Sequence, residues 1–393
     1  MSVFAQLIGQ PSAVQVLQAA ADAAGALHRG DAVGQGAMTH AWLFTGPAGS
    51  GRSVAARAFA AALQCSKAGC GECEACRQSL GGSHPDVAVI APEGLHLVIK
   101  DARDIVARSS RAPTRGRWQV TLIEDADRME ERTSNTVLMA LEEPPPHAVL
   151  LLSAPSTEDL LPTIRSRCRL VPLRTPPTEA VARLLVERDG VDPAMAAFAA
   201  RASQGHIGRA LRMATDEQAR AERREVLSLP RSLAGVGSAL QAAKNLVDAA
   251  QAEAGQVAER RDGPERAALA TALGAGATGK GITGAVSRGG AAALKDLEKQ
   301  QKSRGTRTQR DALDRALVDL AAFYRDVLTL QLRTGTTAVH SDLAQDAAKL
   351  AAATRPEATL RRIEAVFACR EAIETNVAPL LAVEAMALAL RTG

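Results

Sequence analysis

Short apolar runs alternate with helical patterns along the first part of the chain. The apolar runs cover residues 41–45, 87–90, 120–123 and 149–152. Strands this short and uniformly apolar are typical of a parallel sheet that is buried on both faces. Their alternation with helices predicts an α/β fold in which helices cover a parallel sheet.

The pattern changes at a proline-rich stretch, residues 171–177. From Thr178, which we expect to cap a helix, apolar residues recur only at helical spacing. The sequence therefore predicts a sheet domain over residues 1–175, a small helical unit over 176–216 and a longer helical domain over 217–393.

Within the last domain, residues 263–305 are rich in Gly, Ala, Lys and Arg and poor in large apolar residues. This composition predicts a partly mobile or loosely helical insert. Its segment Gly274–Gly281 imitates a phosphate-binding loop and even includes a lysine. No predicted strand precedes it, and Gly281 stands where Ser or Thr would hold magnesium, so we interpret it as low-complexity sequence.

Composition narrows the class of protein. A hydrophobic content of 46% indicates globular domains, and a net charge of +4 does not by itself indicate a nucleic-acid binder. Aromatic residues make up 2% of the chain, which argues against binding by stacking of successive bases. The chain has no apolar run near the roughly 20 residues of a membrane span, and Met1–Gln6 lacks a leader pattern. We expect a cytoplasmic protein without membrane partners.

A glycine-rich loop follows the first predicted strand. Residues 46–53 read Gly-Pro-Ala-Gly-Ser-Gly-Arg-Ser, and an alanine-rich helix comes next. Such a loop wraps backbone N–H groups around phosphate, and the helix adds its positive end. The signature positions are Gly46, Gly49, Gly51, Arg52 and Ser53, with Arg52 in the place of a lysine. Because guanidinium is larger and planar, this exchange weakens the case for ATP and magnesium as ligands.

The third predicted strand ends in an acidic segment, Glu124-Asp125-Ala126-Asp127. Phosphoryl transfer at such a loop needs one carboxylate for magnesium and a polar group that orients water. Here Glu124 precedes Asp125, the reverse of the usual order, so each carboxylate is misplaced by a methylene. A misplacement of ~1 Å can cost about 100-fold in rate. The alternative is that these acids only solvate the end of the strand.

Four of the six cysteines lie within twelve residues: Cys65, Cys70, Cys73 and Cys76. The spacing C-x4-C-x2-C-x2-C allows four thiolates to surround one tetrahedral zinc ion, with no position left open for catalysis. We therefore predict a structural zinc module over residues 65–76. An iron–sulfur cluster and unligated thiols are the alternatives. Cys168 and Cys369 are isolated and are expected to be buried.

Several motifs occur in the order found in bacterial clamp-loader subunits: Phe4–Gln10, the loop at 46–53, the four cysteines, Asn135–Pro145 and Ser166–Cys168. The chain resembles the delta prime family of DNA polymerase III clamp-loader subunits over residues 1 to about 215. A weaker resemblance returns at Asn376–Glu384, and residues 263–305 are outside the common pattern.

The resemblance implies an AAA+ sheet domain with an embedded zinc module, a helical lid and a C-terminal collar that joins five subunits. The implied partners are tau/gamma and delta subunits in a hetero-pentamer, with the sliding clamp and primer–template DNA reached through the complex. Arg167 would act in trans as an arginine finger at a neighbouring subunit's ATP site. The alternative is an ordinary surface arginine in the basic stretch 165–169.

Further departures separate the chain from the ATP-hydrolysing tau/gamma subunits. Ala154-Pro155 stands where those subunits have polar residues that sense the γ-phosphate, and Gly208 stands where they have a lid arginine. Arg209 is the next residue, but one step along a helix turns a side chain by about 100°. Together with Arg52, these changes favour a largely non-hydrolysing stator subunit.

Two other functions stay open. One is a working ATPase of tau/gamma type. The other is a DNA-binding zinc finger, which the near-neutral charge of residues 65–77 disfavours because phosphate contacts need concentrated positive charge.

Overall fold

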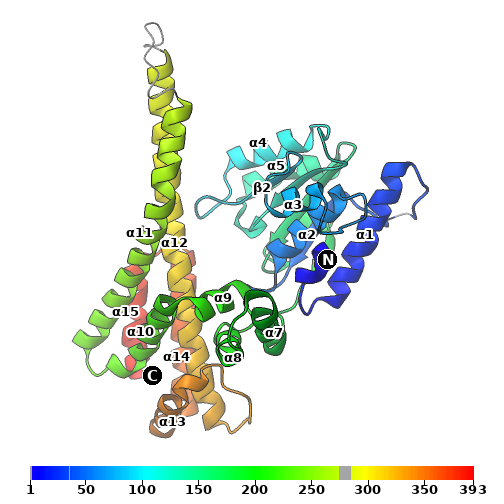
Figure 1. Cartoon of the computed structure of the whole chain (residues 1–393). Helices are drawn as coiled ribbons and strands as arrows, with labels where there is room; N and C mark the ends of the chain where they lie inside the picture. Colours follow the sequence, from blue (N-terminus) through cyan, green and yellow to red (C-terminus); the bar gives the residue numbers. More distant parts are fainter. Residues whose placement is uncertain (1, 35, 274–284) are drawn as a thin grey trace. The chain divides into compact units, whose positions relative to one another are not determined.

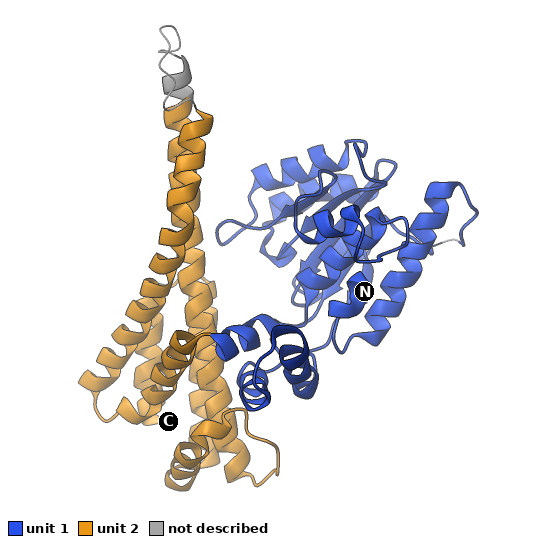
Figure 2. Ribbon diagram, viewed as in Figure 1, with its two compact units in different colours: residues 1–215 blue, residues 216–393 orange. Residues whose placement is uncertain are grey.

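The computed structural model describes residues 2–34, 36–273 and 285–393 and divides into two compact units (Figures 1 and 2). Unit 1 comprises Met1–Thr215 and unit 2 comprises Asp216–Gly393. Each unit has its own apolar core.

Unit 1 is built on a five-stranded parallel sheet with the strand order β2-β3-β4-β1-β5. The strands are β1 (Ala41–Thr45), β2 (Val87–Ile90), β3 (Gln119–Ile123), β4 (Ala148–Ala154) and β5 (Arg169–Pro172). The predicted parallel sheet and its first four strands are confirmed.

Strand β5 was not predicted, because it falls in a basic and proline-rich stretch. It lies at the edge of the sheet, where it pairs with β1 alone among the described strands. An edge strand tolerates Pro172, which has no N–H to donate, and Arg169, whose side chain can reach the surface. The guanidinium of Arg169 lies 4.9 Å from the ring centre of Trp42.

The two faces of the sheet contact different helices. Trp42 and Phe44 of β1 pack in one core with α1 and α2, whereas Ala41 and Leu43 pack in the other core with α4 and α5. Successive side chains of a strand point to opposite faces, so a uniformly apolar strand supplies both cores. Every residue of β1, β3 and β4 is buried.

The helices of unit 1 follow the predicted alternation (Figure 1). They are η1 (Val3–Gln6), α1 (Pro11–Arg29), α2 (Arg52–Gln64), α3 (Glu74–Leu80), α4 (Ile99–Ser109), η2 (Ala126–Arg128), α5 (Glu131–Glu142), α6 (Pro162–Arg165), α7 (Thr178–Asp189), α8 (Pro193–Ala202) and α9 (Ile207–Thr215). Thr178 was predicted to cap α7, but it is the first residue of the helix; the capping residue is Pro177, and no side chain caps the helix.

The carboxyl ends of the parallel strands lie along one edge of the sheet. The loop after β1, the acidic segment after β3 and Pro155 after β4 therefore come together there. Two contacts join them: Gly46 N–H donates to the Pro155 carbonyl (3.1 Å), and Asp125 N–H donates to Ser153 Oγ (3.3 Å).

The regular elements of unit 2 are all helices among its described residues. Its elements are α10 (Glu217–Ser232), α11 (Val236–Ala272), α12 (Ala285–Gln331), η3 (Ser341–Leu343), α13 (Ala344–Ala353), α14 (Pro356–Glu374) and α15 (Pro379–Thr392). One apolar core joins them, with Leu313, Leu317, Leu320 and Tyr324 of α12 fully buried at helical spacing.

A buried polar cluster also holds the helices of unit 2 together. Arg223 of α10 is 4% exposed and pairs with Asp342 at 2.8 Å. The same guanidinium bonds Nδ1 of His340 at 2.7 Å, and Nε2 of His340 bonds the Asp319 carbonyl on α12 at 3.1 Å. Arg223 thus connects α10 to the turn at residue 340.

The Gly- and Ala-rich insert differs from its prediction. Most of residues 263–305 continue two regular helices, α11 up to Ala272 and α12 from Ala285. The predicted low-complexity segment Gly274–Gly281 lies outside the described residues.

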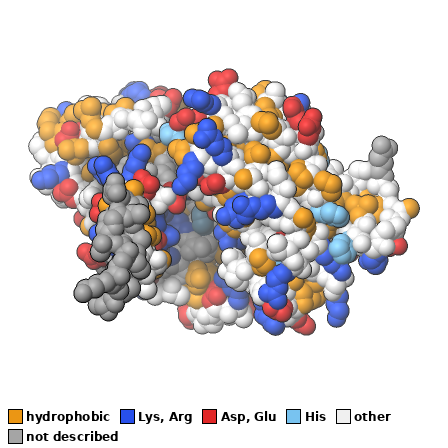
Figure 3. Space-filling model, turned by 90° about the horizontal axis from the view of Figure 1, so that it is seen from above, with side chains coloured by type: hydrophobic (Ala, Val, Ile, Leu, Met, Phe, Trp, Pro, Cys, Tyr) orange, Lys and Arg blue, Asp and Glu red, His pale blue; other side chains and the backbone are white. Residues whose placement is uncertain are grey.

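The described helices include none that is both long enough and apolar enough to span a membrane. Figure 3 shows basic side chains interspersed with acidic and apolar ones over the visible face, in keeping with the formal net charge of +4.

Candidate functional site

The glycine-rich loop has the conformation that its glycines permit. The φ angles of Gly46, Gly49 and Gly51 are 152°, 84° and 90°, a region that side chains with a Cβ rarely enter. Gly51 is the last residue before α2, which begins at Arg52. Strand, loop and helix therefore follow one another as the sequence predicts.

Arg52 bends back onto its own loop. One of its terminal nitrogens donates to the Gly46 carbonyl at 2.6 Å. Burial lowers the pKa of Arg52, and the nearby carboxylates of Asp125, Asp127 and Asp159 oppose that shift. The guanidinium thus bonds the loop backbone and lies within electrostatic reach of acids at the sheet edge.

Two side chains from distant segments close the loop further. The Gln10 amide donates to the carbonyls of Ser50 (3.2 Å) and Arg174 (2.5 Å) and accepts from Arg174 N–H. His206, just before α9, packs on Gly49 so closely that a Cβ there would lie 2.7 Å from the His206 Cα. The loop is therefore held from two sides by the rest of unit 1.

Part of the phosphate-binding machinery is still available. The backbone N–H groups of Gly51, Arg52 and Ser53 have no acceptor among the described residues. They lie at the start of α2, where the helix presents its positive end. Gly208 lies on α9, where an added Cβ would be 3.6 Å from Cε1 of the His206 ring.

The acidic segment is also engaged in contacts within the chain. Glu124 Oε1 accepts a hydrogen bond from Arg57 of α2 at 3.0 Å, with the two side chains 19% and 35% exposed. Asp125 has a positive φ of 49°. Burial raises the pKa of Asp127, and its Oδ1 has no hydrogen-bond donor among the described residues. Glu124 is therefore already paired with a cation where a magnesium ligand was predicted.

Arg167, in contrast to Arg52 and Glu124, is an exposed residue. It lies in the turn between α6 and β5, and its side chain is 36% exposed. One terminal nitrogen of Arg167 pairs with Glu142, at the end of α5, at 2.7 Å. The other terminal nitrogen of Arg167 donates to the Thr163 carbonyl at 2.8 Å. These two contacts fix the direction of the guanidinium while they leave part of it accessible.

The four clustered cysteines meet at one point beside α2 and α3. Their sulfur atoms all lie within 4.8 Å of one another, with Cys65 Sγ 3.6 Å from Cys70 Sγ and 3.7 Å from Cys73 Sγ. A zinc ion with Zn–S bonds of about 2.3 Å requires sulfur separations of about 3.8 Å. The cluster therefore fits a tetrahedral metal ion.

The backbone around the cysteines favours thiolates. N–H groups of Lys67 and Cys70 point at Cys65 Sγ (3.3 and 3.4 Å), and hydrogen bonds from Glu72 and Cys73 lower the pKa of Cys70 to about 6. Burial raises the pKa of the Cys76 thiol, so a metal would have to displace that proton. Of the isolated cysteines, Cys369 is buried as predicted and Cys168 is half-buried.

Part of the chain is similar to known proteins. The profile of the family described as "DNA polymerase III, delta subunit" matches residues 27–177. The chain is 39% identical over 141 residues to DNA polymerase III subunit delta' of Pseudomonas aeruginosa, which covers 34% of this chain and 43% of that protein. Residues 27–177 are therefore similar to subunits of DNA polymerase III.

Members of a second subunit type are similar to the chain as well. DNA polymerase III subunit gamma/tau of Mycobacterium tuberculosis is 31% identical over 212 residues, which is 51% of this chain and 35% of that protein. The chain thus spans about two fifths or less of the length of these two relatives.

Among solved structures, a DNA polymerase III gamma subunit-related protein of Thermotoga maritima is similar with 16% identity and a TM-score of 0.42. That match covers 90% of this chain and 94% of that one. RuvB of Thermotoga maritima is similar with 18% identity and a TM-score of 0.39, over 57% of this chain and 65% of that one.

Four residues that contact the loop, Glu124 or Arg167 were not identified from the sequence as site residues: Gln10, Arg57, Glu142 and His206. Gln10 and Glu142 lie inside motifs noted there, so the motifs were a signal. Nothing in the local sequence marks Arg57 or His206, because their contacts join segments 67 and 157 residues apart.

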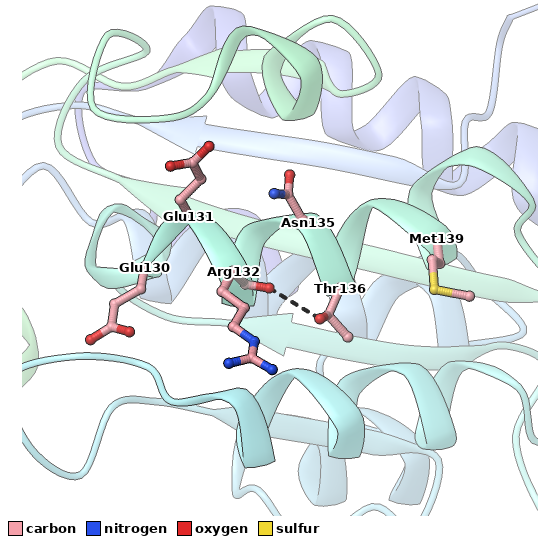
Figure 4. Close-up of a pocket in the computed structure, with 6 residues that line it drawn as sticks. All are labelled: Glu130, Glu131, Arg132, Asn135, Thr136 and Met139. Atoms are coloured by element: carbon pink, nitrogen blue, oxygen red, sulfur yellow. Dashed lines mark hydrogen bonds between the residues drawn. The ribbon is translucent and has the colours of Figure 1, made fainter.

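A separate depression of about 600 Å³ lies along α5, lined by Glu130, Glu131, Arg132, Asn135, Thr136 and Met139 (Figure 4). Thr136 Oγ1 donates to the Arg132 carbonyl within the helix, at 3.1 Å. The depression includes none of the predicted site residues and is therefore separate from the candidate site.

Proposed function

We propose that the chain is a delta prime-type stator subunit of the DNA polymerase III clamp loader. In this proposal an AAA+ module and lid within unit 1 no longer complete an ATPase cycle. The chain instead assembles through the helical collar in unit 2 with tau/gamma and delta subunits, in a hetero-pentamer. That assembly places the sliding clamp on primer–template DNA.

The observation that carries the proposal is the contrast between two arginines. Arg52 bonds the Gly46 carbonyl within its own loop, and Glu124 is paired with Arg57. Both groups would have to leave these partners before the loop could hold ATP and magnesium. Arg167 is held by Glu142 and the Thr163 carbonyl with its guanidinium still accessible.

Arg167 would act across a subunit boundary. A guanidinium placed beside a phosphoryl group stabilises the negative charge that develops during transfer, which is worth about 10³- to 10⁵-fold in rate in related systems. In this role Glu142 is a positioning residue, because it fixes Arg167 without touching the phosphate. The four cysteines would hold a structural zinc ion that stabilises the turn between α2 and α3.

The second candidate is an active ATPase of tau/gamma type. The N–H groups of Gly51, Arg52 and Ser53, which have no acceptor among the described residues, favour it because they can still donate hydrogen bonds to a phosphate. The similarity to a gamma/tau subunit also covers more of this chain than the similarity to delta' of Pseudomonas aeruginosa.

Reconstitution tests the proposed assembly. The chain is mixed with candidate tau/gamma and delta subunits, and clamp loading on primed DNA is measured with and without it. We expect loading to depend on the chain. Equal loading in its absence would contradict the stator function.

ATP turnover by the isolated chain separates the two candidates. We expect background turnover for the wild type, for Arg52→Ala and for a control, Arg111→Ala, whose arginine is exposed and remote in sequence. Turnover that disappears only in Arg52→Ala would instead identify an active ATPase.

A further inference from the structure

Helices α11 and α12 continue past the core of unit 2 as a two-helix arm. We define the arm as residues 255–273 and 290–310, which lie outside the buried Ala254 and Ala312. Figure 2 shows the helix pair continuing beyond the other helices of unit 2. Among the described side chains of the arm, only that of Gln301 is buried. The arm therefore has almost no apolar core to explain its length.

Polar contacts hold the two helices of the arm together. Arg304 of α12 bonds both Asp262 (2.6 Å) and Glu265 (2.5 Å) of α11. Gln301 accepts from Arg266 at 2.7 Å and donates to the Asp262 carbonyl at 3.1 Å. Asp262 and Glu265 are thus paired within the arm and contribute little negative charge to its surface.

The sequence around the arm is unusually basic for this chain. Residues 259–310 contain eleven Lys and Arg against five Asp and Glu, whereas the whole chain contains 47 against 43. The remainder of the chain therefore has a slight excess of acid. The positive charge of this protein is concentrated in a segment of about one eighth of its length.

Three lysines of α12 form one exposed face of the arm, which we call the lysine face: Lys295, Lys299 and Lys302. Their spacing of four and three residues aligns them along one side of a helix over about 10 Å. None of the three ammonium groups forms an ion pair or hydrogen bond among the described residues. Glu298 flanks the face without forming an ion pair with these lysines in that part of the chain.

The chemistry of the lysine face fits a phosphate backbone better than a protein surface. Protein interfaces depend on buried aromatic or arginine anchors, and the next exposed residue along this face is Thr306. Lysine ammonium groups on flexible stems suit evenly spaced phosphates, and duplex DNA offers one charge per about 1.7 Å of its axis. We propose that the lysine face binds the backbone of double-stranded DNA without reading its sequence.

This binding goes beyond the stator function, because neither Arg167 nor the phosphate loop takes part in it. The full-length chain alone should bind. A fluorescently labelled random duplex is therefore titrated with the chain, and anisotropy is recorded at several salt concentrations. The test variant is K295Q/K299Q/K302Q. The matched control is K100Q/K244Q/K349Q, which removes the same charge from three other exposed lysines.

We expect the wild type to bind with an affinity that falls steeply with salt. Each lost phosphate contact reduces the slope of log K against log salt by about 0.9, so the test variant should lose about 2.7. Its affinity at low salt should fall about tenfold or more, while the control variant should bind as the wild type does.

Several results would overturn the proposal. These are no duplex binding by the wild type, equal binding by the test variant, or an equal loss in the control, which would indicate a general charge effect. Equally tight, lysine-dependent binding of a single strand of the same length would reject the duplex as the preferred ligand. Helicity of the test variant by circular dichroism confirms that the arm is intact.

Discussion

In unit 1 the buried carboxylate of Asp86 fixes a loop, whereas in unit 2 the buried guanidinium of Arg223 fixes helices against one another. Asp86 is 1% exposed and accepts hydrogen bonds from the backbone of Thr114, Arg115 and Gly116 at 2.5 to 2.8 Å. Arg223 instead bonds Asp342 and His340, which lie more than a hundred residues away in the sequence.

The difference indicates where each unit depends on polar contacts. Unit 1 uses the Asp86 contacts to hold the loop before β3 at the amino ends of β2 and β3, which is the edge of the sheet opposite the candidate site. Unit 2 uses them between helices that an apolar core already joins. The two tryptophans, Trp42 and Trp118, both belong to unit 1, so their fluorescence follows unit 1 while circular dichroism follows the helices of both units.

The largest expected effect is the loss of the metal from unit 1. Cys70→Ser/Cys73→Ser should remove bound zinc and with it on the order of 10 kcal/mol of metal-binding free energy. Tryptophan fluorescence should then report unfolding at much lower urea, with the helices of unit 2 preserved. Metal analysis should find one zinc per wild-type chain and one per Cys168→Ser control chain. Iron in place of zinc would contradict the assignment.

Removal of the Asp86 carboxylate should have the next largest effect. Asp86→Ala leaves three backbone N–H groups and the Thr114 hydroxyl without their buried acceptor, which should cost about 3–5 kcal/mol of unfolding free energy. Urea unfolding followed by tryptophan fluorescence measures it. The exposed Asp104→Ala provides the control and should change little. A matching loss in the helical signal of unit 2 would show that the units do not unfold separately.

Acid should destabilise the two units in different pH ranges. Burial would raise the pKa of Asp86, but the hydrogen bonds from residues 114–116 outweigh it and lower that pKa to about 2. The lowered pKa of Asp86 contributes about 2 kcal/mol to the free energy of unfolding. This contribution is present above the unfolded pKa near 4 and is lost as the pH falls toward 2.

In unit 2, burial and then the charge of Arg223 lower the pKa of His340, so the fold favours the neutral ring. The lowered pKa of His340 stabilises the folded state of unit 2 above about pH 6.5, and this stabilisation is lost as the pH falls below that value. The helical signal should therefore weaken at a higher pH than the one at which tryptophan fluorescence changes. His340→Gln should make the helical signal less dependent on pH. Simultaneous loss of both signals would contradict the distinction.

A smaller effect is expected in the arm. Arg304→Ala removes the contacts to Asp262 and Glu265, at a cost of about 1–2 kcal/mol that falls mainly on the arm. Hydrogen exchange should accelerate in residues 255–273 and 290–310 and not in the apolar core of unit 2. Arg260→Ala, an exposed neighbour, is the control. Uniform acceleration across unit 2 would show that the contact supports the whole bundle.

Local patterns in the sequence were sufficient to predict much of unit 1. Uniform apolar runs predicted β1 to β4, and the glycines predicted the loop between β1 and α2. Strand β5 was missed because Arg169 and Pro172 are tolerated only at an edge, and edge position depends on the strand order. The spacing of the cysteines also predicted that their sulfur atoms meet.

The sequence prediction for residues 263–305 of unit 2 underestimated how much of this insert is regular helix. Its Ala, Lys, Arg, Gln and Glu residues favour helix, and this propensity outweighs the scattered glycines of α11 and α12. The closed state of the phosphate loop could not be predicted, because it depends on where the Arg52 side chain turns. It also depends on Gln10 and His206, which only the fold brings to the loop.

We propose that Arg167 serves a neighbouring subunit while the chain's own loop stays inactive. The most direct measurement is the DNA-stimulated ATPase rate of the reconstituted clamp loader with Arg167→Ala, compared with the exposed neighbour Arg165→Ala. The account predicts that both variants assemble and that only Arg167→Ala lowers the rate, by removing the site that this arginine completes. An unchanged rate in a fully assembled complex with Arg167→Ala would contradict the account.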